Sequence, residues 1–201
     1  MWCELTARAK APVPVRLGRG AKAPLFPMKH LVQNDSPHLS NDPQFRLAVE
    51  ADADLVLDFM RSYYAFDGHG FDREKARAAL VPLLRDPNLG RAWLISGDGL
   101  PIGYIVICFG YSLEWLGRDA FVDEFYLRQE YRGRGWGQKS MAFLEDAARD
   151  LGVRALHLEV VGGNDSAGHL YRKLGFQPHH STLLSKWIEK NFSKPPSPRR
   201  H

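Results

Sequence analysis

Two adjacent carboxylates near the middle of the chain, Asp123 and Glu124, have the residue type needed to take a proton from a substrate. A turn rich in glycine and arginine follows a few residues later. Its glycines and arginines are Gly133, Gly135, Gly137, Arg132 and Arg134. Glycine lets a backbone approach a ligand closely because it has no Cβ, and arginine adds positive charge. The stretch 123–137 therefore combines groups suited to proton transfer with groups suited to holding an anion such as a phosphate.

The elements that must position these groups are an apolar strand, the glycine turn and a helix. Apolar residues recur at helical spacing after the turn, at Met141, Leu144, Ala147, Ala148 and Leu151. The glycines thus lie at the amino end of a helix, where free N–H groups and the helix dipole favour an anion. Spacing excludes two common phosphate motifs. A P-loop needs Lys-Ser/Thr directly after its last glycine, and a dinucleotide fingerprint needs G-x-G-x-x-G, whereas this chain has G-x-G-x-G followed by Gln138.

Read from Arg132, the turn resembles the Q/R-x-x-G-x-G/A signature of the GNAT superfamily of N-acetyltransferases, whose loop holds the pyrophosphate of acetyl-CoA. Asn164 and the segment Y-R-K-L-G-F at 171–176 strengthen the likeness. The acidic pair and the loop together resemble spermidine/spermine N-acetyltransferases most closely. Trp136 departs from the pattern, since the superfamily more often has a small aliphatic residue at that position.

The resemblance implies three catalytic residues. Glu124 is preferred as the base or the amine anchor and Asp123 is second, because neighbouring strand side chains point to opposite faces unless a bulge re-aims them. Tyr171 matches a family tyrosine that donates a proton to the coenzyme sulfur, and a free pKa of about 10 suits that role. From the residues alone, the carboxylates could equally be satisfied at a strand edge, and Tyr171 could pack on the sheet.

The same resemblance assigns an acetyl-CoA site to the strand end, the glycine turn and the later helix. Its residues are Phe125, Tyr126, Leu127, Arg132, Gly133, Arg134, Gly135, Trp136, Gly137, Gln138, Asn164 and Tyr171. Leu127 is expected to offer main-chain groups to the pantetheine amides. Asn164 matches a family residue that hydrogen-bonds the coenzyme, although its position also suits a helix cap or a turn. No metal is expected, since the histidines do not fall at a metal-site spacing.

Composition limits the class of protein. A chain of 201 residues with 44% hydrophobic content can build one domain, and it has no apolar run long enough to cross a bilayer. The only cysteines are Cys3 and Cys108, which argues against a disulfide framework and favours a cytoplasmic protein. The net charge of +4 divides into +5 for residues 1–29, +4 for 186–201 and −5 between them. An acidic middle argues against nucleic-acid binding and favours a cationic substrate.

Residues 43–190 are expected to form a single GNAT N-acetyltransferase domain between two basic ends. Residues 1–42 have no sustained periodicity and are interpreted as a disordered or dispensable extension. An organelle presequence in residues 1–27 is the alternative, because this stretch is rich in Arg and Lys and poor in acids. Residues 191–201 are interpreted as a disordered basic tail.

The order of expected elements predicts an α/β fold, with a central mixed and mostly antiparallel sheet flanked by helices on both faces. The GNAT resemblance implies the same architecture over residues 44–188. Pro82 is expected to kink or end the second helix early. Expected strands cover 45–49, 91–96, 101–111, 120–127, 154–160 and 176–187, and expected helices cover 50–64, 72–85, the stretch from the glycine turn to 150, and 165–174.

These patterns lead to one functional hypothesis and one alternative. The chain is expected to move an acetyl group from acetyl-CoA directly to a primary amine, without an acyl-enzyme, because Cys108 in an apolar strand is a poor nucleophile. The amine could belong to a polyamine, an aminoglycoside or a lysine side chain. The alternative is a catalytically silent acyl-CoA-binding regulatory module. No membrane or nucleic-acid partner is expected, and a homodimer is compatible with the resemblance.

Overall fold

A mixed five-stranded sheet forms the centre of the part of the chain that this computed structural model describes, residues 42–68, 70–160, 164–179, 181–186 and 188. The strands follow chain order across the sheet, as β1 (Gln44–Leu47), β2 (Gly90–Gly97), β3 (Leu100–Ser112), β4 (Gly117–Leu127) and β5 (Ala155–His157). β1 to β4 pair antiparallel, whereas β5 pairs parallel to β4. All the described residues lie within one compact unit, His38–His201.

The β2–β3 hairpin is closed by a two-residue turn. Asp98 and Gly99 both have positive φ angles, 53° and 77°, and such turns match the right-handed twist of the strands that they join. β3 lies between β2 and β4, and its residues 102–107 are all buried. A strand covered on both faces must be almost wholly apolar, and this segment reads Ile-Gly-Tyr-Ile-Val-Ile. Its one polar atom in a side chain is therefore the hydroxyl of Tyr104.

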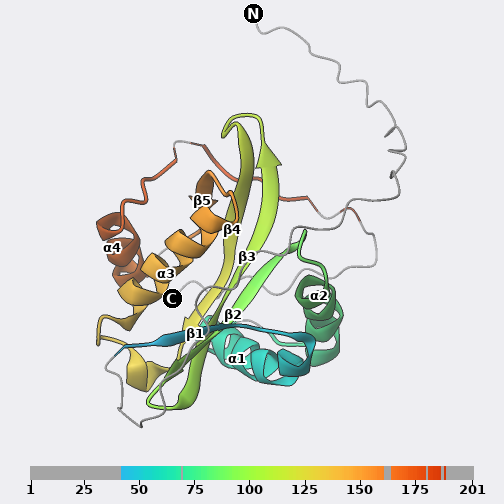
Figure 1. Cartoon of the computed structure of the whole chain (residues 1–201), viewed down its shortest axis with the longest axis vertical. Coiled ribbons are helices and arrows are strands. Elements are labelled where there is room, and N and C mark those ends of the chain that lie inside the picture. The colour runs from blue at the N-terminus through green and yellow to red at the C-terminus, as the bar shows by residue number, and fades with distance from the viewer. Residues whose placement is uncertain (1–41, 69, 161–163, 180, 187, 189–201) are drawn as a thin grey trace, which may run out of the picture. The chain divides into compact units, whose positions relative to one another are not determined.

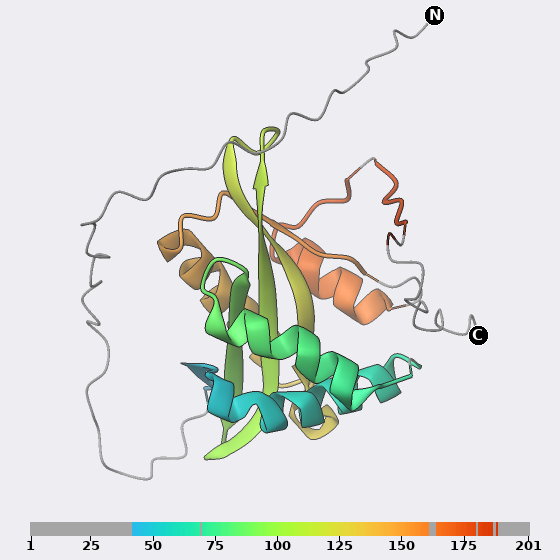
Figure 2. The ribbon, with the colours of Figure 1, turned by 90° about the vertical axis from the view of Figure 1, so that its right-hand side faces the viewer.

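Two pairs of helices cover opposite faces of the sheet (Figure 1). α1 (Ala53–Phe66), which follows the short 3-10 helix η1 (Glu50–Asp52), lies beside α2 (Arg73–Arg85), and Figure 2 looks onto this layer. α3 (Trp136–Asp150) and α4 (Asp165–Lys173) lie on the other face. None of the described helices combines the length and the apolar character needed to cross a membrane. The predicted fold class, a mixed sheet with helices on both faces, is confirmed.

Alternation of side chains along the strands divides the core into two clusters. Tyr104 and Val106 of β3 belong to the cluster under α1 and α2, where they join Leu57. Ile105 and its neighbours of the same parity belong to the cluster under α3, where they join Leu144. Burial of these apolar surfaces is the main force that holds the helices to the sheet.

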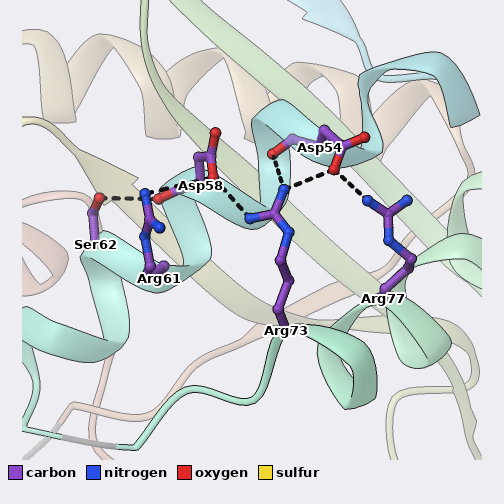
Figure 3. A network of polar contacts seen from close by, with 6 residues as sticks. All are labelled: Asp54, Asp58, Arg61, Ser62, Arg73 and Arg77. Carbon is purple, nitrogen blue, oxygen red and sulfur yellow. Dashed lines mark hydrogen bonds and ion pairs between the residues drawn. The ribbon is translucent and has the colours of Figure 1, made fainter.

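A network of ion pairs joins α1 to α2 on the outer surface (Figure 3). The guanidinium of Arg73 on α2 donates to Asp54 at 2.7 Å and to Asp58 at 2.8 Å, and both acids are on α1. Arg77, one turn further along α2, also donates to Asp54. These side chains are largely exposed, so each pair contributes little free energy on its own.

Trp136, the residue that departs from the superfamily pattern, is accommodated in the core under α3. Its side chain is buried, and its indole stacks on Tyr131 with ring centroids 5.4 Å apart. Gly97 makes this possible, because a Cβ placed there would lie 2.1 Å from the Trp136 Cζ3 atom. The large ring at the start of α3 therefore fits only because the facing position on β2 has no side chain.

Three details of the predicted elements are corrected by the structure. The final strand expected at 176–187 is wrong, since the described residues in this range form no strand, and Leu183 and Leu184 are 69% and 88% exposed. The strand expected at 154–160 is shorter than predicted, since β5 covers only Ala155–His157, and this leaves a short edge for any further strand to pair with. Pro82 does not end α2, which continues to Arg85, because Leu83 and Leu84 pack on the core and the Asp86 N–H still donates to the Pro82 carbonyl. The extension and tail predicted for residues 1–42 and 191–201 lie outside the described residues except at position 42.

We expect Gly97→Ala to lower the free energy of unfolding by about 1–3 kcal/mol, since the added methyl group would overlap the indole of Trp136. Urea unfolding followed by circular dichroism measures the change. The control is the same substitution in a Trp136→Leu background, where the smaller side chain leaves room and the cost should largely vanish. An equal cost in both backgrounds would contradict the contact.

Candidate active site

A β-bulge on β4 sets the positions of the two acidic residues. Val106 of β3 pairs with Glu124, whereas the next residue, Ile107, pairs with Val122, so Asp123 is the extra residue in the ladder. The bulge considered from the sequence is therefore present. It breaks the simple alternation of the strand at the point where the two carboxylates lie, and it leaves Glu124 buried and Asp123 exposed.

Glu124 is held in a nearly dry environment beneath α1. Glu124 is only 7% exposed, and the Tyr104 hydroxyl donates to its Oε2 atom at 2.6 Å. Burial raises the pKa of the Glu124 carboxyl to about 7, and the charge of Asp123 adds to this effect, while hydrogen bonds from Tyr104 and Tyr64 oppose it. A carboxyl with this pKa can both accept and release a proton near neutral pH, as a general base must.

Asp123 lies in a different environment from its neighbour. The residue is exposed, yet surrounding protein atoms still desolvate its carboxyl partly and raise its pKa from the ordinary value. An exposed carboxylate can meet a cation from solvent, whereas a buried one with a raised pKa can accept and release a proton near neutral pH. The surroundings of the two neighbouring carboxylates therefore favour different chemistry.

Tyrosines from α1 and a cysteine from β3 complete the surroundings of the acids. Burial raises the pKa of Tyr63 to about 12, with smaller contributions from Asp67, Glu124, Tyr171 and Asp123. The pKa of Tyr64 is raised by burial and then by Glu124. Burial, together with the charges of Asp123 and Glu124, raises the pKa of the Cys108 thiol to about 11. Cys108 therefore remains a neutral thiol, which makes it a poor nucleophile.

The glycine turn between β4 and α3 has the backbone conformation of an open anion site. It follows the 3-10 helix η2 (Gln129–Tyr131), and Gly133 and Gly135 have φ angles of 74° and 78°. A Cβ placed on either glycine would meet no atom within 4 Å, so these two are needed for their left-handed conformation and face open space. At Gly137 a Cβ would lie 3.4 Å from Leu170 of α4, an ordinary van der Waals distance, so the structure shows no such requirement for glycine at this position.

The start of α3 differs from those of α2 and α4. In α2 the Asp72 side chain accepts from the Lys75 N–H, and in α4 the Asn164 side chain accepts from the Ala167 N–H. α3 begins at Gly135 with no side-chain cap and with no acidic residue in its first turn. Its first amides and the positive end of its dipole are therefore available to an anion.

The two arginines of the turn have different partners. The Nε atom of Arg132 donates to the Leu127 carbonyl at 2.8 Å, and its guanidinium lies over the rings of Phe66 and Tyr126, 4.3 and 5.5 Å from their centroids. Arg132 thus ties the turn to the end of β4 and to the end of α1. Arg134 is exposed, with its guanidinium 5.2 Å from the ring centre of Tyr131. Of the two, Arg134 has the greater freedom to meet a ligand phosphate.

The two predicted site residues of α4 lie on the α3 side of the sheet. Asn164 is the amino-terminal cap, and its Oδ1 accepts from the Ala167 N–H and from the Ser166 hydroxyl, both at 3.2 Å. Its cap role, one of the two predicted from the sequence, is confirmed, and its side-chain amide N–H₂ group has the donors that a ligand could use. Tyr171 packs edge-on against Phe176, and burial raises the pKa of its hydroxyl.

The predicted acids, the strand end and the glycine turn follow one another along the chain, from the end of β4 through η2 to the start of α3. Tyr171 and the two acids each contribute to the raised pKa of Tyr63. Sequence reasoning missed Tyr64 and Tyr104 as neighbours of Glu124. Their contact depends on strand register and helix packing, and no motif or spacing in the sequence signals it.

Two of the described histidines lie near other carboxylates, Asp119 and Glu114. His157 Nε2 is 3.4 Å from Asp119, His179 Nε2 is 3.7 Å from Glu114, and both rings lie near Trp115. Over the residues that the structure describes, no group of three or more His, Cys, Asp or Glu side chains could hold a metal ion.

Comparison with protein families gives a match over most of the described domain. Residues 53–176 match the model of the acetyltransferase (GNAT) family. Thialysine N-epsilon-acetyltransferase of Bos taurus is 36% identical over 91 residues, which cover 43% of this chain and 53% of the relative. An uncharacterized N-acetyltransferase of Bacillus subtilis (strain 168), YycN, is 42% identical over 69 residues, covering 34% of this chain and 44% of the relative. The matches thus span about half the length of these curated relatives.

Solved structures share the arrangement of elements over about three quarters of the chain. An integron cassette protein from the mobile metagenome of Cole Harbour Salt Marsh superposes with a TM-score of 0.66 and 33% identity, covering 73% of this chain and 91% of that one. A protein of Clostridium acetobutylicum, described as a predicted acetyltransferase with acetyl-CoA, has a TM-score of 0.62 and 18% identity, covering 75% of this chain and 99% of that one. At that identity the second likeness concerns the fold alone.

Burial of Glu124 makes a prediction about stability. Because the folded-state pKa of about 7 lies above the ordinary value of 4.5, the folded protein binds more protons than the unfolded chain between these values. Stability should therefore fall as the pH rises through this window, and Glu124→Gln should remove the loss. Between about pH 5 and about pH 8, the variant should gain up to about 3 kcal/mol relative to the parent in urea unfolding. Glu114→Gln, at an exposed site, retains Glu124 and should give a pH curve parallel to that of the parent, whereas a parallel curve for Glu124→Gln would contradict burial of the charge.

Proposed function

The chain belongs to the acetyltransferase (GNAT) family, and we propose that it transfers an acetyl group from acetyl-CoA directly to the primary amine of a cationic acceptor. The observation that carries this proposal is the position of Glu124, a buried carboxyl with a pKa of about 7, on the strand that leads into an uncapped glycine turn. A base tuned to neutral pH and an anion site on one strand are the two parts that such a transfer needs.

The glycine turn fits the diphosphate of acetyl-CoA. Gly133 and Gly135 face open space in left-handed conformations, and the first turn of α3 offers amides without a side-chain cap. Gly137 and Gln138 extend this amide run, and Arg134 can add charge from the solvent side. The indole of Trp136 is in the core, so only its main chain is available to the coenzyme. When bound, acetyl-CoA would supply the acetyl group as a thioester.

The residues before the turn would guide the rest of the coenzyme. Phe125, Tyr126 and Leu127 lie between the bulge and the turn, where their main-chain groups can pair with the pantetheine arm. The carbonyl of Leu127 already accepts from Arg132, although a carbonyl oxygen can accept a second hydrogen bond. Asn164 has donor atoms for the same arm at the start of α4.

The reaction divides its proton transfers between two side chains. Glu124 takes the proton of the acceptor ammonium, directly or through water, so that the neutral nitrogen can attack the acyl carbon. The new bond joins this nitrogen to the carbon, and the bond from the carbon to sulfur breaks. Tyr171, whose hydroxyl stays protonated because burial raises its pKa, supplies the proton that the departing sulfur needs. Cys108 remains a neutral thiol, which favours direct transfer without an acyl-enzyme.

The proposed acceptor is a cationic amine. Asp123, exposed beside the buried Glu124, offers a carboxylate that can hold the ammonium group or a second positive charge. The name of the bovine relative, a thialysine N-epsilon-acetyltransferase, favours a lysine-like amine. Polyamines and aminoglycosides, which also carry several ammonium groups, remain within the proposed class.

We expect Glu124→Gln to lower kcat by about 100-fold or more at neutral pH while leaving the Kd for acetyl-CoA within about twofold, since a general base contributes that much to the rate. The kcat/KM of the parent should decrease as the pH is lowered below about 7, because Glu124 becomes protonated. The variant should show no such decrease. Release of CoA thiol, measured with a panel of lysine analogues, polyamines and aminoglycosides, gives the rates.

Asp123→Asn is the matched control for that substitution. It should raise the acceptor KM by about tenfold with little change in kcat, as expected for loss of one ionic anchor. The reverse pattern, with Asp123→Asn inactive and Glu124→Gln unaffected, would make Asp123 the base. Binding of CoA with no transfer to any amine of the panel would favour the alternative of a silent acyl-CoA-binding module.

Gly135→Val should reduce the affinity for CoA at least about 100-fold, because a β-branched residue cannot adopt the left-handed conformation at the start of α3 without strain. Isothermal calorimetry with CoA measures the loss. Gly152→Val is the matched control, since Gly152 also has a positive φ angle and open space but follows the other end of α3. Equal losses in both variants would show that damage to the helix, and not to the anion site, is responsible.

A further inference from the structure

The hydroxyl of Tyr104 is hydrogen-bonded to one of the two carboxylate oxygens of Glu124. It donates to Oε2 at 2.6 Å, within the range of short hydrogen bonds to an ionised acceptor. Tyr104 is 0% exposed and Glu124 is 7% exposed, so bulk water competes poorly for this contact. A hydrogen bond in such surroundings is stronger than one at the surface.

The position of that hydroxyl is fixed by the core and not by the site. Tyr104 lies on β3, the strand between β2 and β4, and its ring packs nearly parallel to that of Phe59 on α1, with centroids 6.0 Å apart. The ring of Tyr126 packs against it at an angle, with centroids 6.5 Å apart. The ring therefore has little room to turn, and the phenol oxygen is a rigid point in the sheet.

We propose that Tyr104 is a positioning residue, which holds Glu124 through Oε2 as the base that takes the proton of the acceptor amine. This inference rests on the proposed function, in which Glu124 is the base. Tyr104 is buried on the neighbouring strand and acts only through Glu124. Its role is to restrict the rotation of the carboxylate, so that the carboxylate is presented to the acceptor in one orientation.

The hydrogen bond also sets the charge state of the base. It stabilises the carboxylate and so lowers the pKa of Glu124 against the larger effect of burial. The pKa of Tyr104 is itself raised well above 10 by burial and by Glu124, so the phenol remains a donor at every pH at which Glu124 titrates. The other titratable groups that interact electrostatically with the Glu124 carboxylate are Tyr63 and Tyr64 from α1, Cys108 from β3 and Asp123 from β4.

The test is a direct titration of Glu124 in the full chain labelled with ¹³C-glutamate. The carboxyl resonance of Glu124 is assigned by its absence in Glu124→Gln, and its midpoint in the parent should lie at about pH 7. In Tyr104→Phe the midpoint should move upward by about one pH unit, the size expected for loss of one hydrogen bond to a charged group. An unchanged midpoint would overturn the proposal.

A second variant keeps the test open if Tyr104→Phe does not fold. Placing 3-fluorotyrosine at position 104 retains the ring and makes its hydroxyl more acidic and a stronger donor, so the midpoint should move downward. Tyr111→Phe, which removes a hydroxyl from an exposed residue of the same strand, should leave the midpoint unchanged. A shift in Tyr111→Phe equal to that in Tyr104→Phe would also overturn the proposal.

Activity supplies the readout that separates positioning from packing. In Tyr104→Phe, the pH at which kcat/KM decreases on the acidic side should rise together with the midpoint of the Glu124 resonance. The kcat at higher pH, where it no longer changes with pH, should fall about tenfold because the carboxylate can now rotate. A lower rate with no shift in the pH of that decrease would indicate a packing role only and would contradict the inference. If no amine is acetylated by the parent, the proposed function fails, whereas the titration of Glu124 still decides the role of Tyr104.

Discussion

The withdrawal of one carboxylate from water is the constraint on which the site depends. An ionised acid costs several kcal/mol to bury unless hydrogen bonds or an opposite charge replace its hydration. In the described part of the chain, Glu124 receives hydroxyl donors and no lysine or arginine pairs with it. A cation beside it would hold its pKa far below neutral, whereas neutral donors leave it near 7. The tyrosine surroundings therefore offset part of the burial cost without removing the basicity.

β4 fixes the position of the base relative to the anion site, because it carries Glu124 and leads into the glycine turn. The bulge places Glu124 against β3, and a few residues later the strand ends in the turn that opens α3. A strand hydrogen-bonded to its neighbour is more rigid than a loop, so the separation between base and anion site is set by backbone geometry. Arg132 extends this rigidity, since it links the turn to the Leu127 carbonyl and to the ring of Phe66 at the end of α1.

Features that depend on local backbone chemistry could be predicted from the sequence, and those that depend on packing could not. The glycine turn, the Asp72 cap and the tight turn at Asp98 and Gly99 follow from residue types at fixed offsets. The contact of Tyr104 with Glu124 depends on the register of two strands and on a bulge. The strand expected at 176–187 failed for a similar reason, because an apolar pattern does not show whether a sheet edge is long enough to accept another strand.

The pairing of Gly97 with Trp136 limits which side chains the two positions can hold together. Because the indole occupies the space of a missing side chain, a side chain at 97 is compatible only with a smaller residue at 136. A smaller residue at 136 is still compatible with glycine at 97, so the dependence between this strand and the helix that opens the anion site runs in one direction.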